Sequence, residues 1–283
     1  MFRTRRALEF LSVIASLVPT IAASALFDGQ QQRSPEDPRQ IVSQAVTTEL
    51  AANRDDHSRW LYFEVDKKPK NSTTQWVAET PNGDVRRVLE SGAKKLSSAE
   101  QHKKMDEFVG DPDRQAQQKK AGEHDDRQAT ELLKLLPDAF TWTNTGSSNT
   151  GSSNGSTVLH FKPSASFHPP DRESRVFAAM EGDMAVDDFQ HRIVSLKGHL
   201  IRDVKFGGGL FAELKAGGTF DVERRETAKG IWQITETHVH IDGHALLFKS
   251  IAEQEDDVKT KFKQLPDDLS LQQAEQELLK QDQ

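Results

Sequence analysis

The fold is decided by the stretch Thr74-Gln-Trp-Val-Ala-Glu79, Pro81-Asn-Gly-Asp84 and Val85-Arg-Arg-Val-Leu89. Its two outer segments contain β-branched and aromatic residues, and the Asn-Gly pair between them is typical of a tight hairpin turn. The segment before them, residues 58–65, has the same strand-like composition. We therefore expect three consecutive antiparallel strands in this part of the chain.

Most of the chain after Ser156 continues this pattern. Short apolar or alternating segments are separated by turn signals such as Gly207–Gly209 and Asp242-Gly243, which favours an antiparallel sheet that curls. We expect Asp242-Gly243 to join the last two of these strands as a hairpin. The expected strands are 158–161, 176–187, 193–196, 199–206, 218–224, 230–241 and 244–251.

Helix signals appear at four places. Asp37-Pro38 before an apolar stripe predicts a helix over 38–54, and Ser97-x-x-Glu100 is a capping box that predicts a helix to about Val109. A charged run over 119–126 precedes an amphipathic helix that Pro137 should end. Ser270 with Gln273 predicts a helix at the C-terminus.

The pattern as a whole predicts an α+β fold in which a curled antiparallel sheet forms a half-open β-barrel with covering helices. The expected organisation is a signal peptide (1–25), a flexible lead-in (26–36), one half-barrel domain (37–265) and a C-terminal helical tail (266–283). Within the domain we expect a helical insertion at 97–136 and a disordered loop at 145–156, where Thr-Gly-Ser-Ser-Asn occurs twice in succession.

The N-terminus has the order of a secretory signal peptide. Three arginines within residues 3–6 precede an apolar run over 10–18, and Ala23-Ser24-Ala25 supplies a cleavage site. An uncleaved membrane anchor is the alternative, but the apolar run over 10–18 is shorter than the stretch of about 20 apolar residues that a membrane-spanning helix needs. We expect a periplasmic protein, or failing that a secreted one, with no stable membrane anchor after cleavage. The arginines leave Sec and twin-arginine export both open.

Composition excludes several classes of protein. The 283 residues contain no cysteine, which excludes disulfides, thiolate metal sites, a cysteine nucleophile and a lipid-modified N-terminal cysteine. A net charge of −7 argues against nucleic acid as a partner, because phosphate binding needs clustered Lys and Arg. The Gly207–Gly209 run lacks the Lys-Ser/Thr of a phosphate loop, so we expect no cofactor.

No catalytic or metal site is expected either. His238, His240 and His244 are spaced like metal ligands, but the expected hairpin puts His244 on the opposite face of the sheet from the other two. Gly151-x-Ser153-x-Gly155 matches a hydrolase nucleophile elbow, yet it lies in the Ser/Asn repeat rather than between a strand and a helix. We predict a non-enzymatic protein, with a periplasmic hydrolase as the lesser alternative.

The aromatic composition suggests a ligand. The chain has 15 Phe against one Tyr. In a curled sheet some of these side chains could line a concave pocket for acyl chains or an apolar peptide, and the alternative is that all of them fill the core. The candidate lining residues are Phe177, Phe206, Phe211, Phe220, Trp232 and Phe248.

One segment resembles a known superfamily. Met180-Glu-Gly-Asp-Met-Ala-Val-Asp187, followed by Arg192-Ile193, is similar to a strand–turn–strand motif of the LolA/LolB/RseB-like periplasmic proteins, and 220–249 is similar to their later strands. The resemblance implies a half-open barrel that holds the acyl chains of lipids or lipoproteins. We therefore expect a periplasmic carrier or sensor that binds an acyl chain, a lipid or a lipoprotein in the cavity of the half-barrel. The alternative function is an interaction or scaffold module for envelope proteins, without a ligand pocket.

Overall fold

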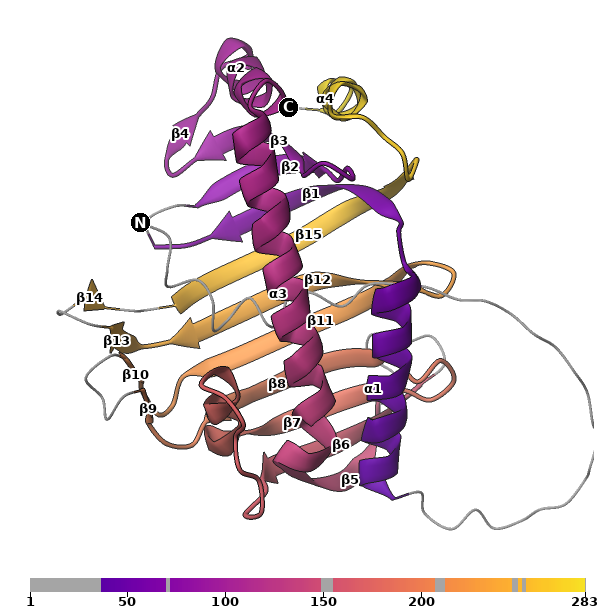
Figure 1. Cartoon of the computed structure of the whole chain (residues 1–283), viewed down its shortest axis with the longest axis vertical. Helices are drawn as coiled ribbons and strands as arrows, with labels where there is room; N and C mark the ends of the chain where they lie inside the picture. Colours follow the sequence, from indigo (N-terminus) through magenta and orange to yellow (C-terminus); the bar gives the residue numbers. More distant parts are fainter. Residues whose placement is uncertain are drawn as a thin grey trace, which may run out of the picture.

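The computed structural model describes residues 37–69, 72–148, 155–206, 212–245, 249–250 and 253–282. The expected signal peptide and lead-in lie outside these residues. The described helices are α1 (Pro38–Asp55), α2 (Ser98–Val109), α3 (Pro112–Ala139), the 3₁₀ helix η2 (Glu173–Ala179) and α4 (Leu271–Leu279) (Figure 1).

The main sheet has eleven antiparallel strands among the described residues, so the α+β class with an antiparallel sheet is confirmed. The sheet is open, with β4 at one edge and β5 at the other. A smaller sheet contains β14 (Lys249–Ser250), β13 (Gly243–Ala245), β10 (Ala212–Leu214) and β9 (Val204–Phe206). The main order is β4 (Lys94–Lys95), β3 (Val85–Ser91), β2 (Thr73–Ala78), β1 (Arg59–Lys67), β15 (Glu253–Leu265), β12 (Ile231–Ile241), β11 (Thr219–Ala228), β8 (Ile193–Leu200), β7 (Met180–Asp187), β6 (Ser156–Pro163) and β5 (Phe140–Ser148).

One face of the sheet carries the main apolar core. Residues directly opposite each other on neighbouring strands share a face, and the register places Phe161, Gly182, Gly198, Phe220 and Val239 in one row across β6 to β12. We call this the inner face and the other the outer face. Helices α1 and the C-terminal part of α3 pack against the inner face in a single buried cluster (Figure 1).

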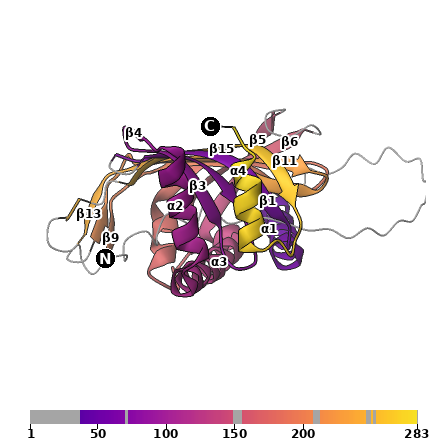
Figure 2. The ribbon, with the colours of Figure 1, turned by 90° about the horizontal axis from the view of Figure 1, so that it is seen from above.

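Helices α2 and α4 cover the outer face of β1 to β3, while the 3₁₀ helix η2 belongs to the inner-face cluster. Leu61 and Trp76, which alternate with the inner-face residues of β1 and β2, form a second buried cluster with α2 and α4. In Figure 2, β1 and β3 turn out of the plane of the remaining strands toward the helices. The twist of the sheet, which accumulates from strand to strand, therefore brings helices on opposite faces to the same side of the molecule.

Two glycines allow close packing in the centre of the sheet. Gly182 on β7 lies directly opposite Gly198 on β8. A Cβ atom on Gly182 would overlap the backbone of Lys197, and one on Gly198 would come within 2.6 Å of the ring of Phe220. The ring of Phe220 thus occupies space that a side chain at position 198 would need.

Several sequence expectations are confirmed at the level of elements. The first helix begins at Pro38 with Asp37 as its cap, and both bonds of the Ser97/Glu100 capping box are present at the start of α2. The three-strand meander of residues 59–91 is present, and α4 begins with the capping box of Ser270 and Gln273. In each case the local signal agrees with the tertiary packing.

The helical insertion differs from the expectation. We expected the charged run and the Leu-rich helix to be separate and Pro137 to end the latter, but α3 is one helix of 28 residues that contains Pro137. A proline removes one backbone hydrogen bond and crowds the preceding turn. Pro137 lies in the last turn, and its neighbours Leu136 and Ala139 are buried in the main cluster, so packing holds the helix to Ala139.

Three strand predictions are wrong. Instead of strands at 193–196 and 199–206, the main sheet contains β8 (Ile193–Leu200) and the smaller sheet contains β9 (Val204–Phe206). Residues 176–179 belong to η2 rather than to a strand, and Phe177 is buried in the main cluster there. The expected hairpin at Asp242-Gly243 is also absent, because β12 pairs with β15 while β13 pairs with β10 in the smaller sheet. The central strand β15 takes the place next to β12 that the hairpin partner would have had.

The loop in the Ser/Asn segment is shorter than the expected 145–156. β5 continues to Ser148 and β6 begins at Ser156, and Ser147 and Thr157 are paired. The ladder continues because Gly146 has a φ of 134°, where the register shifts by one residue. The nucleophile-like Ser153 lies outside the described residues.

Candidate functional site

Four of the six predicted lining residues are described, and these four do not all come together at one site. Phe177, Phe206 and Phe220 belong to the main cluster on the inner face. Trp232 packs separately with Ala185 and Val194. Phe211 and Phe248 lie outside the described residues.

The four described members are all buried and packed. Their exposed fractions are 0% for Phe177, 6% for Phe206, 3% for Phe220 and 1% for Trp232. Phe177 contacts the rings of Phe140 and Phe167. Their apolar surface is therefore covered by the protein itself: the three phenylalanines by the helices and strands of the main cluster, and Trp232 by Ala185 and Val194.

A buried ion cluster fixes α1 to the sheet. Glu49 on α1 is fully buried and accepts hydrogen bonds from Arg224 at 2.6 Å, from Arg192 at 2.9 Å and from the backbone N–H of Ile193 at 2.8 Å. Burial by itself would raise the pKa of Glu49, but the guanidinium groups of Arg224 and Arg192 hold it below its ordinary value. Glu49 is thus an ionised anchor inside the core.

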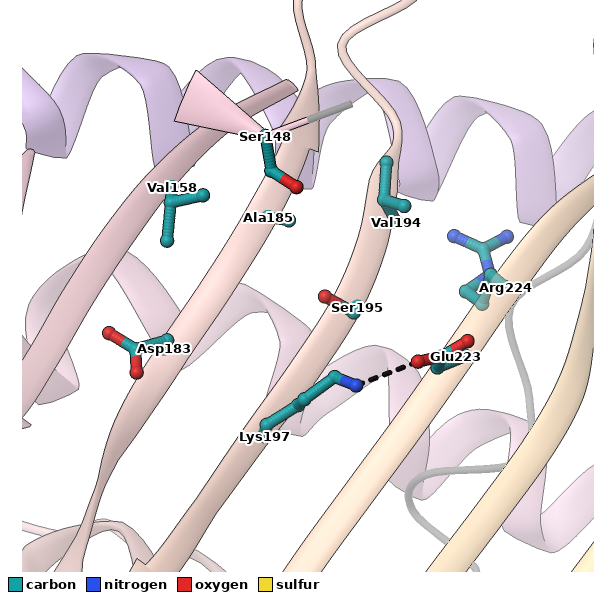
Figure 3. Close-up of a pocket in the computed structure, with 9 residues that line it drawn as sticks. All are labelled: Ser148, Val158, Asp183, Ala185, Val194, Ser195, Lys197, Glu223 and Arg224. Carbon is teal, nitrogen blue, oxygen red and sulfur yellow. Dashed lines mark hydrogen bonds and ion pairs between the residues drawn. The ribbon is translucent and has the colours of Figure 1, made fainter. Parts of the chain in front are cut away.

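A shallow pocket of about 230 Å³ lies on the outer face, over β6, β7, β8 and β11 (Figure 3). Lys197 forms a 2.7 Å ion pair with Glu223 across it. The volume is below the range of about 300–1,000 Å³ that is usual for small-molecule sites. None of the four described residues of the predicted lining borders this pocket. Its lining residues are Ser148, Val158, Asp183, Ala185, Val194, Ser195, Lys197, Glu223 and Arg224.

The outer face also carries two histidines that each lie within hydrogen-bond distance of one aspartate. Asp256 Oδ1 lies 2.7 Å from His238 Nδ1 and 2.9 Å from His240 Nε2. The hydrogen bond to Asp256 raises the pKa of His238 above its ordinary value, and the two histidines lower the pKa of Asp256. The two histidines share a face, as expected, but no group of three or more His, Asp or Glu side chains among the described residues is placed to hold a metal ion.

The most exposed large apolar side chain of the described residues is Phe189, in the turn between β7 and β8, with 78% of its surface accessible. The turn around it is firmly held. Asp187, fully buried, accepts hydrogen bonds from the backbone N–H groups of Phe189 at 3.0 Å and Gln190 at 2.5 Å. His191 adopts a positive φ of 53°, which non-glycine residues adopt at a cost.

Side chains from neighbouring strands form further hydrogen bonds to this turn. Trp232 Nε1 donates to Gln190 Oε1 at 3.1 Å, and Thr157 donates to Asp188 at 2.7 Å. The sequence contained a usable signal, a phenylalanine inside the polar turn Asp187-Asp-Phe-Gln-His191. Sequence reasoning missed it because every phenylalanine was assigned to a core or a pocket.

Comparison with known proteins adds little to this geometry. No family model matches the chain, and no curated protein matches it. A solved structure of a DUF1329 family protein from Desulfovibrio piger aligns over 80% of this chain and 92% of its own, with 10% identity and a TM-score of 0.29. Within the described residues, no helix has the length and apolar character needed to cross a membrane.

Proposed function

We propose that this chain is an exported, non-enzymatic binding protein that docks onto a partner protein through the turn that carries Phe189. The observation behind the proposal is that the side chain of Phe189 is 78% exposed, on a turn whose backbone N–H groups are held by the buried carboxylate of Asp187. Burying one such side chain in a partner's apolar pocket contributes about 1.5–3 kcal/mol. A turn that is already ordered loses little further conformational entropy on binding.

The shallow pocket on the outer face lies close enough to this turn to belong to the same partner-binding surface. Ala185 and Val194 line it, and β7 and β8, which contain them, lead into the turn of Phe189. A partner that accepts the phenylalanine could therefore extend its contact along these strands, where an apolar floor is bordered by the Lys197–Glu223 pair (Figure 3). This arrangement of an aromatic anchor beside a polar rim is typical of protein interfaces.

Site-specific photo-crosslinking in cells tests the proposal. A photoreactive phenylalanine at position 189 should give one defined protein adduct, while the same residue at Leu279, which is 39% exposed on α4, should not. Asp187→Ala, which releases the turn, should weaken the adduct in a chain labelled at 189. Equal adducts from both positions, or none from position 189, would reject the proposal.

A second candidate is a carrier for acyl chains, in which the sheet acts as a half-open barrel. The observation that favours it is the gathering of Phe177, Phe206 and Phe220 in one inner-face cluster that helices, rather than further strands, close. Because these side chains are packed, a ligand would enter only when α1 or α3 moves away from the sheet. The resemblance to LolA/LolB/RseB-like proteins supports this candidate.

Lipid retention separates the two candidates. Delipidated protein is incubated with a labelled fatty acid or a lipidated peptide and then separated by gel filtration. Retained label that is lost in Phe220→Ser would favour the carrier, and retention that is unchanged by Phe189→Ala would assign it to the inner face. Absence of retained label would exclude the carrier.

Export belongs to the same proposal. Residues 1–25 have the order of a signal peptide, and the mature chain would begin at Leu26. N-terminal sequencing of the protein from a periplasmic fraction should return Leu-Phe-Asp-Gly. Recovery of uncleaved chain in the membrane or cytoplasm would contradict export.

A further inference from the structure

The inner face is polar where β1, β15 and β12 lie side by side. Asp257 on β15 lies directly opposite Asp66 on β1 and, on its other side, directly opposite Thr237 on β12. The three residues therefore form a row across three neighbouring strands, with their side chains on one face. Two carboxylates in direct cross-strand opposition repel each other.

Lysines compensate only part of this charge. Lys68 Nζ lies 2.6 Å from Asp66 Oδ2 and 2.5 Å from Glu255, while Lys259 Nζ lies 3.2 Å from Asp257 Oδ2 and 3.7 Å from Glu64. Each lysine is thus shared between two carboxylates, and Arg86 also pairs with Glu64 at 3.1 Å, so three cations face four carboxylates. Each aspartate of the row uses its Oδ2 atom in these pairs.

The remaining oxygens of the row are buried without a partner. Asp66 Oδ1, Asp257 Oδ1 and Thr237 Oγ1 form no hydrogen bond to the described protein. Thr237 is 5% exposed and Asp257 is 9% exposed. A buried polar atom that lacks a partner costs about 1–3 kcal/mol, more when it is charged, so these three atoms need partners that the described protein does not supply.

We propose that Asp66, Asp257 and Thr237 bind a hard divalent cation, with Mg²⁺ as the best fit. Carboxylate and hydroxyl oxygens are ligands of hard cations, and Mg²⁺ commonly uses one or two carboxylates while it keeps several waters. A cation beside Asp257, together with the waters it keeps, would supply partners for these oxygens and would offset the repulsion between the two aspartates. A single water can donate only two hydrogen bonds and would leave the charge in place.

Thermal unfolding of the full mature chain tests the site. After treatment with EDTA, the protein is melted in MgCl₂, in CaCl₂ and in KCl of equal ionic strength. The wild-type protein should gain at least about 2–4 °C in Mg²⁺ over KCl, and the gain should saturate. Asp66→Asn and Thr237→Val should reduce this gain, and Asp66→Asn should melt no lower than wild type in EDTA because it relieves the repulsion.

Asp221→Asn is the matched control. Asp221 lies on the outer face, opposite His238, and also has one buried oxygen without a partner, so its substitution should leave the Mg²⁺ response intact. A wild-type protein that melts at the same temperature in Mg²⁺ and KCl would overturn the proposal in favour of a shared proton or a water. An undiminished response in Asp66→Asn would also overturn it, and neither result bears on Phe189.

Discussion

At the scale of single residues, Glu49 is the strongest polar constraint on the fold. It is an ionised carboxylate, fully buried, between two guanidinium groups that are 2% and 4% exposed. Glu49→Ala would leave both cations buried without their counter-ion, and we expect it to reduce the free energy of unfolding by about 3–5 kcal/mol. Urea denaturation monitored by circular dichroism measures this loss.

An exposed ion pair of the same helix, α1, is its control. Arg39 on α1 pairs with Asp138 on α3, and both side chains are more than 60% exposed. Asp138→Ala should cost only about 0–1 kcal/mol, because solvent screens such pairs. If the two substitutions cost the same, the buried cluster is not the element that holds α1 in place.

Glu79 gives the chain a pH-dependent stability. Burial, together with nearby Asp84, raises the pKa of Glu79 to about 8, against an ordinary value of 4.5. The folded state therefore retains a proton that the unfolded state loses, and stability should fall as the pH rises from about 4.5 to 8. In Glu79→Gln, which can still accept the 3.0 Å hydrogen bond from Trp60 N–H, this fall should be smaller.

Denaturation midpoints of the two proteins at pH 5, 6, 7 and 8 measure the difference. The gap between them should widen in favour of Glu79→Gln toward pH 8. Parallel curves across this range would show that Glu79 ionises normally in the folded protein.

At the scale of elements, the contact between β7 and β8 depends on glycine. Gly198→Ala would push a methyl group to 2.6 Å from the ring of Phe220 and into the backbone of β7, so overpacking should cost about 1–3 kcal/mol. Gly122→Ala in the exposed part of α3 meets no atom within 4 Å and should stabilise the helix by up to about 1 kcal/mol. Opposite signs in urea denaturation would agree with this account, and equal signs would contradict it.

The same scale shows where sequence reasoning succeeds and fails. Elements marked by local chemistry, such as the caps at Asp37, Ser97 and Ser270, were predictable because the signal lies within four residues. Strand β15 was missed although it is central, because its sequence Glu-Gln-Glu-Asp-Asp-Val-Lys-Thr-Lys has neither an apolar run nor an alternation. Several of its charges pair with residues distant in sequence, as Lys259 does with Glu64 and Glu255 does with Lys68.

The candidate sites could not be predicted from the sequence for the same reason, since they depend on contacts between residues distant in sequence. The predicted lining residues are real parts of an apolar cluster, but which of them are packed depends on α1, and Glu49 reaches across 143 positions to Arg192. Likewise, the row of Asp66, Asp257 and Thr237 exists only through the pairing of β1, β15 and β12. No local pattern encodes these two features.

At the scale of the whole molecule, α3 links two cores on opposite faces of one sheet. Its C-terminal part packs Leu132, Leu133 and Leu136 into the main cluster. Near its N-terminus, Gln118 accepts a 2.6 Å hydrogen bond from the backbone of Asp84, beside the cluster that α2 and α4 cover. Between these ends, residues 119–123 are exposed, so the middle of α3 connects the cores without packing.

This arrangement predicts that breaking α3 in its exposed middle will uncouple the two cores. Trp142 lies in the main cluster and Trp76 in the second, so chains that keep only one of these tryptophans report on each core separately by fluorescence. Without further change, the two reporters should give the same urea midpoint, because the sheet and α3 both join the cores. Ala121→Pro removes a backbone hydrogen bond and clashes with the preceding turn, at about 3 kcal/mol or more, and should separate the midpoints. Ala121→Gly keeps the hydrogen bond at a cost of about 1 kcal/mol and should shift both midpoints together. Midpoints that still coincide in Ala121→Pro would show that the continuous sheet, through β15, carries the coupling alone.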